Sequence, residues 1–283
     1  MDSPPPAGGD AGAMTLTRER PAPTALLQKV PEITVSFWAA KLATTAFGEA
    51  FSDFVFFNDY LGQHLAILLG LAFFAVCMVI QFTRRRYVPA VYWLGVTAVS
   101  IFGTMSADFL NQDLGMPLWA STLLLLVLQG AVFTAWYVTQ KTLNVHSITT
   151  HLRELFYWLT VLFTFALGTA AGDFVSTTLG LGTFAATFVF LAAILVPAVG
   201  FRWLRMNEVL AFWLAYTFTR PLGASFADWL GVPAPYGDGL QLGTSTTSLG
   251  FGVILVGVVA ALAVRARRRD RSNGPAASPV TAR

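Results

Sequence analysis

Residues 38–54 read WAAKLATTAFGEAFSDF, and the spacing of Trp, Gly and Asp in this stretch recurs three more times along the chain. In each copy a tryptophan is followed ten positions later by a glycine, and five positions after that by an aspartate. The tryptophans are Trp38, Trp93, Trp158 and Trp213, the glycines are Gly48, Gly103, Gly168 and Gly223, and the aspartates are Asp53, Asp108, Asp173 and Asp228. Four copies at identical spacing predict four structural repeats. The tryptophans are 55, 65 and 55 residues apart. This spacing indicates that each half of the chain contains two repeats and that one half is a duplicate of the other.

The sequence around these motifs is too apolar for a water-soluble protein. Of the 283 residues, 55% are apolar and only 12% are charged, and the mean hydropathy is +0.62. Soluble domains carry about 25% charged residues. This composition excludes a disordered chain and an ordinary soluble enzyme. It predicts a multi-pass membrane protein in which lipid takes the place of the missing polar surface.

Apolar stretches of about 20 residues, the length that a helix needs to cross a bilayer, recur along the chain. There are eight, at roughly residues 33–57, 64–82, 88–110, 118–138, 154–176, 182–201, 207–230 and 246–264. We therefore expect an all-α integral membrane protein with eight transmembrane helices, built as four tandem helical hairpins in two duplicated halves. In each hairpin the helix that carries the motif would run from the inner to the outer side, and a helix without the motif would run back. All four motif helices would then run in the same direction, as parallel internal repeats.

The transmembrane domain is expected to cover residues 30–264, and its four repeats are expected at about 30–82, 88–138, 153–201 and 207–264. Residues 1–29 are rich in Pro, Ala and Gly and contain no signal-peptide core, so we expect a disordered arm there. Residues 265–283 begin with four arginines within five positions and end in Ser, Pro and Ala. This composition predicts a basic, disordered tail.

The basic residues are distributed unevenly between the two sides of the predicted bundle. Sixteen of the 18 Lys and Arg residues lie in the terminal segments or in the loops after even-numbered helices. The loops after odd-numbered helices contain Asp59, Asp113 and Asp238 instead. The positive-inside rule then places both termini in the cytoplasm, where the basic tails would bind anionic lipid head groups.

Seven charged residues fall inside the predicted helices, away from their inner ends. They are Lys41, Arg220, Glu49 and the four motif aspartates, with a net charge of −3 when all are ionised. At about 100° per residue, Lys41, Thr45, Glu49 and Asp53 share one face of their helix with Trp38. Such a stripe is costly in lipid and should face the bundle interior or a wet cavity. The balance of charge favours a cation over an anion.

Several of these residues allow a structural as well as a functional interpretation. The aspartates either cap helices and form hydrogen bonds between helices, or they bind a cation. Lys41 and Arg220 occur in one repeat each, and they either form an ion pair with Glu49 or Asp228 or take part in coupling. The tryptophans lie near the inner helix ends, where they either anchor the protein in an aromatic belt or line a path for cations.

The motif glycines favour close helix packing. Each one precedes a second small residue by four positions, namely Ser52, Ala107, Gly172 or Ala227. Small residues at this spacing let two helix backbones approach closely in lipid. We therefore expect the motif helices to touch one another near their outer ends and to bring their carboxylates together there.

The chain resembles a known family in four segments. These are KVPEIT at residues 29–34, TTAFGEAFSDF at 44–54, FALGTAAGD at 165–173 and TRPLGASFAD at 219–228. They are similar to a bacterial family of multi-pass proteins that are described as uncharacterised membrane-anchored proteins. The resemblance implies a location in the bacterial inner membrane, and it implies no activity and no catalytic residue.

We expect a small-cation transporter or channel, specific for a divalent metal or coupled to protons, that uses the intramembrane aspartates. Carboxylates suit Mg²⁺, Mn²⁺ or Ca²⁺, but the sequence does not identify a metal.

One alternative is a membrane sensor or organising protein that transports nothing. A less favoured alternative is an intramembrane aspartyl protease, because residues 170–173 read AAGD and lack the first glycine of a GxGD signature. We expect no enzymatic activity, no cofactor and no nucleic acid. The expected partners are the lipid bilayer and a small cation, and the sequence does not give the oligomeric state. The longest outer loop, residues 231–248, is either a lid over the mouth or a floppy connection.

Overall fold

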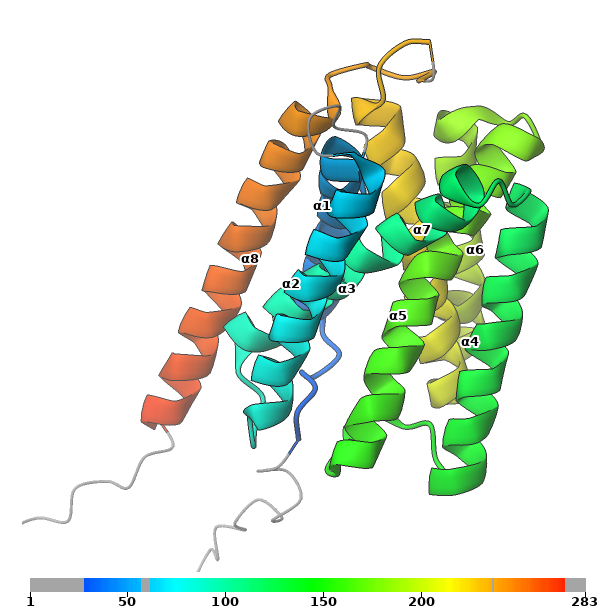
Figure 1. Cartoon of the computed structure of the whole chain (residues 1–283). Coiled ribbons are helices and arrows are strands. Elements are labelled where there is room, and N and C mark those ends of the chain that lie inside the picture. Colours follow the sequence, from blue (N-terminus) through cyan, green and yellow to red (C-terminus); the bar gives the residue numbers. More distant parts are fainter. Residues whose placement is uncertain (1–27, 57–61, 236, 273–283) are drawn as a thin grey trace, which may run out of the picture.

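The computed structural model describes residues 28–56, 62–235 and 237–272, with the side chains of residues 270–272 left out. All regular structure in these residues is helical (Figure 1). The long helices are α1 (Val35–Phe56), α2 (Gln63–Thr83), α3 (Pro89–Asp108), α4 (Leu118–Gln140), α5 (His151–Asp173), α6 (Gly182–Trp203), α7 (Glu208–Gly231) and α8 (Thr244–Ser272). Short π-helical turns, η2 (Phe109–Asp113) and η4 (Phe174–Thr178), continue α3 and α5, and a 3₁₀ turn, η3 (Val145–Ser147), precedes α5. The prediction of eight helices in an all-α fold is confirmed.

Six of the helices are long and apolar enough to cross a membrane: α2, α3 with η2, α4, α5 with η4, α6 and α8. The two helices outside this group, α1 and α7, carry Lys41, Glu49 and Asp53, and Arg220 and Asp228, respectively. Their polar residues turn toward the protein interior. The architecture is therefore compatible with a membrane protein whose most polar helices are sheltered by apolar ones.

The motif helices α1, α3, α5 and α7 form a closed central ring in which each one packs against the next and α7 packs against α1. Each motif glycine lies against the following motif helix in this cycle. Gly48 contacts Ser100, Gly103 contacts Phe165, Gly168 contacts Arg220, and Gly223 contacts Thr45. The expected close packing through small residues is therefore present at all four interfaces.

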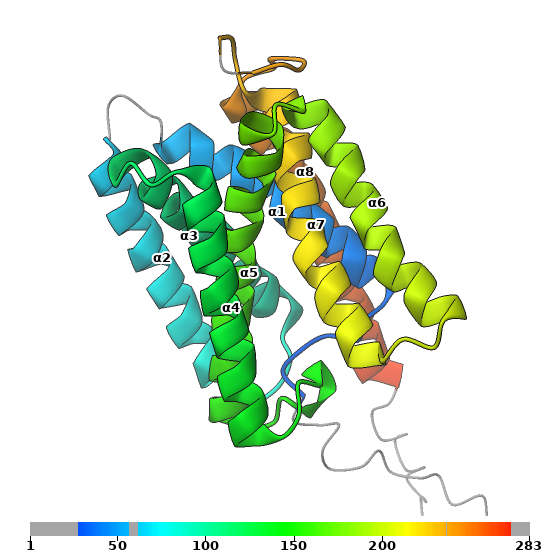
Figure 2. The ribbon, with the colours of Figure 1, turned by 90° about the vertical axis from the view of Figure 1, so that its right-hand side faces the viewer.

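The even-numbered helices cover the ring from outside, but each packs mainly on the motif helix of the next repeat. Helix α2 lies on α3, α4 on α5 and α6 on α7, while α8 lies on α1 and completes the circle (Figure 2). The two helices of each expected hairpin therefore make few contacts with each other. The short loops 84–88 and 204–207 hold α2 and α6 beside the helices that follow them.

The two ends of the bundle differ in charge. We call the end with loops 84–88, 141–150 and 204–207 the basic end, and the end toward which the four motif aspartates lie the acidic end. Residue 28 and the end of α8 both lie at the basic end (Figure 1). The prediction that an even number of helices brings the chain ends to one side is confirmed for the described residues.

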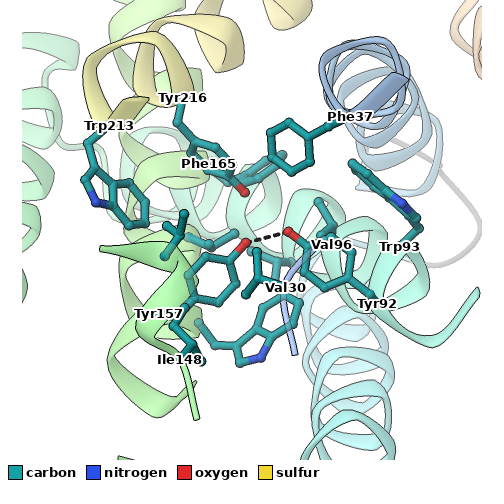
Figure 3. Close-up of a cluster of buried hydrophobic side chains, with 14 of the residues drawn as sticks. Val30, Phe37, Tyr92, Trp93, Val96, Ile148, Tyr157, Phe165, Trp213 and Tyr216 are labelled. Atoms are coloured by element: carbon teal, nitrogen blue, oxygen red, sulfur yellow. Dashed lines mark hydrogen bonds between the residues drawn. The ribbon is translucent and has the colours of Figure 1, made fainter. Parts of the chain in front are cut away.

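The basic half of the ring is filled by aromatic side chains (Figure 3). Trp93, Trp158 and Trp213 are buried in this cluster, and Trp38 is partly buried beside it. The indole of Trp213 donates a hydrogen bond to the carbonyl oxygen of Leu143 at 2.9 Å. The anchoring interpretation is therefore wrong for the three buried tryptophans, because neighbouring ring helices cover the face that the motif occupies.

The first described residues close the basic end. The side chain of Lys29 is buried and forms an ion pair with Glu154, which also accepts a hydrogen bond from Gln81 at 3.1 Å. The backbone N–H of Tyr87 donates to the carbonyl of Gln28 at 3.0 Å. Residues 28 and 29 are therefore not part of a disordered arm as expected, and residues 1–27 lie outside the described part. Glu154 is only 1% exposed, and Lys29 supplies the opposite charge that a buried carboxylate requires.

Helix α8 continues through Ser272, so residues 265–272 are helical and not part of a disordered tail. Arginine and alanine are good helix formers, which explains the extension beyond the apolar segment. Arg269 near this end pairs with Glu32 at 3.2 Å. Residues 273–283 lie outside the described part.

We predict that Gly103→Ala and Gly223→Ala each reduce the stability of the detergent-solubilised protein. A Cβ at Gly103 would lie 2.8 Å from the Cβ of Phe165, and a Cβ at Gly223 would lie 2.6 Å from the Cβ of Thr45. Overpacking of this kind costs about 1–3 kcal/mol. Gly130→Ala is the matched control, since nothing lies within 4 Å of a Cβ at that helical site. Equal thermal unfolding temperatures for all three variants would contradict close glycine packing in the ring.

Candidate functional site

The motif frame places one residue of each ring helix in each of five layers. Residues four apart share a helix face, and the four ring helices run in the same direction. Counted from the basic end, the layers are Phe37, Tyr92, Tyr157 and Phe212; Lys41, Val96, Val161 and Tyr216; Thr45, Ser100, Phe165 and Arg220; Glu49, Thr104, Thr169 and Ala224; and Asp53, Asp108, Asp173 and Asp228. The layers change from aromatic to acidic toward the acidic end.

The aspartate layer and Glu49 of the layer before it line a cavity of about 1020 Å³ at the acidic end. Its wall includes Glu49 and all four motif aspartates. Asp108 is 5% exposed, whereas the other three aspartates are only half-buried, so solvent reaches them. The five acidic residues that the sequence singled out are thus brought together around one space.

Arg220 lies behind Glu49, outside the cavity wall itself, with no exposed surface. It reaches all three of the other ring helices. Its Nη2 pairs with Glu49 and donates to the hydroxyls of Thr104 and Thr169. Its Nη1 donates to the carbonyl of Thr45 at 3.0 Å, and its Nε donates to that of Phe165 at 3.3 Å. Of the two alternatives for Arg220, the structure therefore shows the ion pair, and its partner is Glu49.

Ala224 is the residue of the glutamate and threonine layer that comes from the helix of Arg220 itself. Because its side chain is a single methyl group, it leaves the centre of the ring to the guanidinium group. The layer thus combines one carboxylate, two hydroxyls and one small residue around a single cation. This arrangement satisfies a buried charge that would otherwise be very costly.

Lys41 lies one layer nearer the basic end than Arg220's own layer and is also fully buried. Its Nζ lies 4.0 Å from the ring centroid of Phe165 and 4.2 Å from that of Tyr216. Within the described residues this Nζ has no hydrogen-bond partner. The expected ion pair with Glu49 or Asp228 is therefore wrong for Lys41, because Arg220 occupies Glu49 and aromatic faces surround the amine.

Several cavity residues were missed by the sequence analysis. Asn111 and Gln112 come from η2, and Ser176 and Thr177 come from the equivalent turn η4, while Thr183 and Thr244 begin α6 and α8. The sequence contains a signal for the four residues of η2 and η4. The positions 18 and 19 after the motif tryptophan are polar in repeats two and three only. The π-helical turns aim them at the cavity, a detail that residue spacing in a regular helix does not contain.

Two polar side chains in the cavity wall have no hydrogen-bond partner among the described residues. They are the Oδ2 atom of Asp108 and both amide atoms of Asn111. Buried polar atoms are almost always hydrogen-bonded in folded proteins. A carboxyl group and an amide of the cavity wall that lack a protein partner therefore favour a polar or charged occupant of that cavity.

Two of the outer-loop aspartates, Asp113 and Asp238, are not part of the cavity wall. The carboxylate of Asp238 accepts hydrogen bonds from the backbone N–H of Thr183, at 2.8 Å, and from its hydroxyl. Asp113 lies 3.9 Å from the imidazole of His64, and Asp59 lies outside the described residues. No group of three His, Cys, Asp or Glu side chains in residues 28–56, 62–235 and 237–272 is close enough to hold a metal ion.

The connection between α7 and α8 is tied down at several points instead of hanging free. Besides the contact of Asp238 with α6, the N–H of Leu240 donates to the carbonyl of Trp229 at 2.8 Å. The N–H of Leu242 donates to the carbonyl of Leu230 at 2.9 Å. Val232 and Pro233 of this connection belong to the cavity wall, so the loop borders the mouth of the cavity.

We predict that Arg220→Met lowers the free energy of unfolding by about 3–5 kcal/mol, because Glu49 would remain buried without its partner. The double variant Glu49→Gln/Arg220→Met should be destabilised by less than the sum of the two single changes. Lys41→Met is the matched control, since it removes an amine that no described hydrogen-bonding group contacts. Denaturant unfolding of the solubilised protein measures all four variants. An Arg220→Met variant as stable as Lys41→Met would contradict the proposed balance of buried charges.

Comparison with known proteins identifies the repeat. The family described as Repeat of Unknown Function (DUF347) matches residues 36–87, 91–142, 156–206 and 211–268. Each matched stretch begins two residues before a motif tryptophan. No curated protein and no solved structure matches the chain. The four matches together cover most of the chain and confirm its fourfold organisation, and the chain therefore belongs to the DUF347 repeat family.

Proposed function

We propose that this protein is a small-cation transporter and that the cavity at the acidic end is its cation site. The observation that carries the proposal is the imbalance of charge around that cavity. Glu49 is paired with Arg220, whereas no ion pair among the described residues includes Asp53, Asp108, Asp173 or Asp228. Four carboxyl groups therefore face one space without a basic partner.

A cation in the cavity would supply the missing positive charge. Carboxyl groups that share one confined space oppose each other's ionisation, and a cation between them removes that repulsion. The partner-free atoms of Asp108 and Asn111 would then face an occupant that they can bind. Binding of this kind, and not enzymatic chemistry, is the role that the residues of the cavity support.

The remaining layers favour a transporter over an open channel. Beyond the Glu49–Arg220 pair the axis of the ring is filled by Lys41 and by the aromatic cluster, and Lys29 and Val30 close the basic end. A cation that enters from the acidic end thus meets a buried positive charge and then closely packed rings. Alternating access, in which the repeats move against each other around a binding site, fits this arrangement.

The proposal includes a location in the bacterial inner membrane with both termini in the cytoplasm. The excess of Lys and Arg at the basic end supports this orientation. The apolar surfaces of α2, α4, α6 and α8 would contact lipid. In this orientation the cavity opens toward the side opposite the cytoplasm.

We predict that purified protein in liposomes gives transient currents on a solid-supported membrane when Mn²⁺, Mg²⁺, Ca²⁺ or organic ammonium ions are applied. Asp108→Asn and Asp173→Asn should each reduce the response by about tenfold or more, as expected when a charged group in a binding site loses its charge. Asp113→Asn is the matched control, because Asp113 is acidic and close in sequence but does not line the cavity. Wild-type protein that responds to no cation, or full responses from both cavity variants, would contradict transport.

A further inference from the structure

The size of the cavity and the positions of its acidic groups bear on the kind of cation that it accepts. A bare divalent metal requires six or more oxygen ligands within about 2.0–2.6 Å of one point. In the described residues no three acidic, histidine or cysteine side chains are placed to share an ion. The five carboxyl groups instead surround a space of about 1020 Å³, which is the size of a pocket for an organic molecule.

A large part of the cavity wall is apolar. The apolar wall residues are Phe54, Met116, Pro117, Leu118, Val232 and Pro233. Phe54 immediately follows the motif aspartate Asp53 on α1 and is 40% exposed. An inorganic ion with its hydration shell gains nothing from such a surface. The apolar part of an organic cation gains about 25 cal/mol for each Å² that it buries there, and an aromatic face also attracts an ammonium group.

The partner-free groups fit the same kind of ligand. Asp108 belongs to the cavity wall and is only 5% exposed, and its buried Oδ2 has no hydrogen-bond partner among the described residues. Asn111, one helical turn further along the chain, offers a donor and an acceptor that are likewise unpaired. A protonated amine can donate hydrogen bonds to these oxygen atoms, whereas a quaternary ammonium group offers the carboxylate its charge alone. Neither group demands a fixed coordination geometry.

We propose that the cavity binds an organic ammonium ion with an apolar arm in preference to a bare divalent metal. This inference rests on the proposed function, of which it specifies the substrate class. The charged head lies among the aspartates near Asp108, and the arm lies against the apolar wall near Phe54. Glu49 of the Glu49–Arg220 pair forms the floor beneath the ligand.

The test is calorimetric titration of the full-length protein in detergent with three probes: benzyltrimethylammonium, tetramethylammonium and MnCl₂. The benzyl compound should bind about tenfold or more tightly than tetramethylammonium, because it adds an aromatic arm to the same charged head. Phe54→Ala should reduce this preference, and the variant should fold because Phe54 is partly exposed. Asp108→Asn should weaken both ammonium probes by about tenfold, whereas Asp113→Asn should leave both affinities unchanged.

The possible results separate this inference from the proposed function. Tight binding of Mn²⁺ together with weak binding of both ammonium ions would overturn the substrate class and leave a cation site in place. Equal affinities for the two ammonium probes would also overturn it, because the apolar wall would then make no contribution. Absence of binding for all three probes would overturn both proposals. Retention of tight benzyltrimethylammonium binding by Asp108→Asn and Asp173→Asn would place the ligand elsewhere.

Discussion

The structure depends on the close approach of four parallel helices, which is possible because each carries a glycine where the next one crosses it. Small residues let helix backbones approach closely, and the packing contacts between the backbones then hold the helices together. Here the four contacts follow one another in a cycle, from Gly48 through Gly103 and Gly168 to Gly223. Once the ring is closed, the face that carries the motif must point inward. The burial of the tryptophans, the convergence of the aspartates and the position of Arg220 all follow from that closure.

Within this regular frame, a few substitutions give the interior its chemistry. The layer that contains Glu49 has threonine in two other repeats and alanine in the fourth, and the neighbouring layer has arginine only in the fourth repeat. One guanidinium group can therefore contact every other repeat at once, with Glu49, Thr104 and Thr169 at Nη2. The aspartate layer, in contrast, is the same in all four repeats. The cavity wall thus contains one aspartate from every repeat, above a layer that differs between the repeats.

Much of this arrangement could be predicted from the sequence, because it depends on periodicity. Helix number, the direction of the motif helices and the grouping of the aspartates follow from apolar length and from the spacing of Trp, Gly and Asp. Helix-to-helix pairing did not follow, since α2 is equally apolar whether it lies on α1 or on α3. Asn111 and Ser176 were missed because a π-helical turn changes the direction of side chains that a regular helix would aim elsewhere. The partners of Lys29 and Glu154 are 125 residues apart, a distance across which sequence spacing contains no pairing information.

The position of α8 against α1 has a consequence for the origin of the chain. Because this contact repeats the packing of α2 on α3, α4 on α5 and α6 on α7, a half-length ancestor with two repeats would form the same ring as a symmetric dimer. An arginine at the centre of such a dimer would occur twice, and two like charges would meet in the interior. Joining the halves in a single gene removes that restriction. A lone Arg220 paired with a lone Glu49 on the neighbouring helix is an arrangement that a fused, pseudosymmetric chain permits and a symmetric homodimer does not.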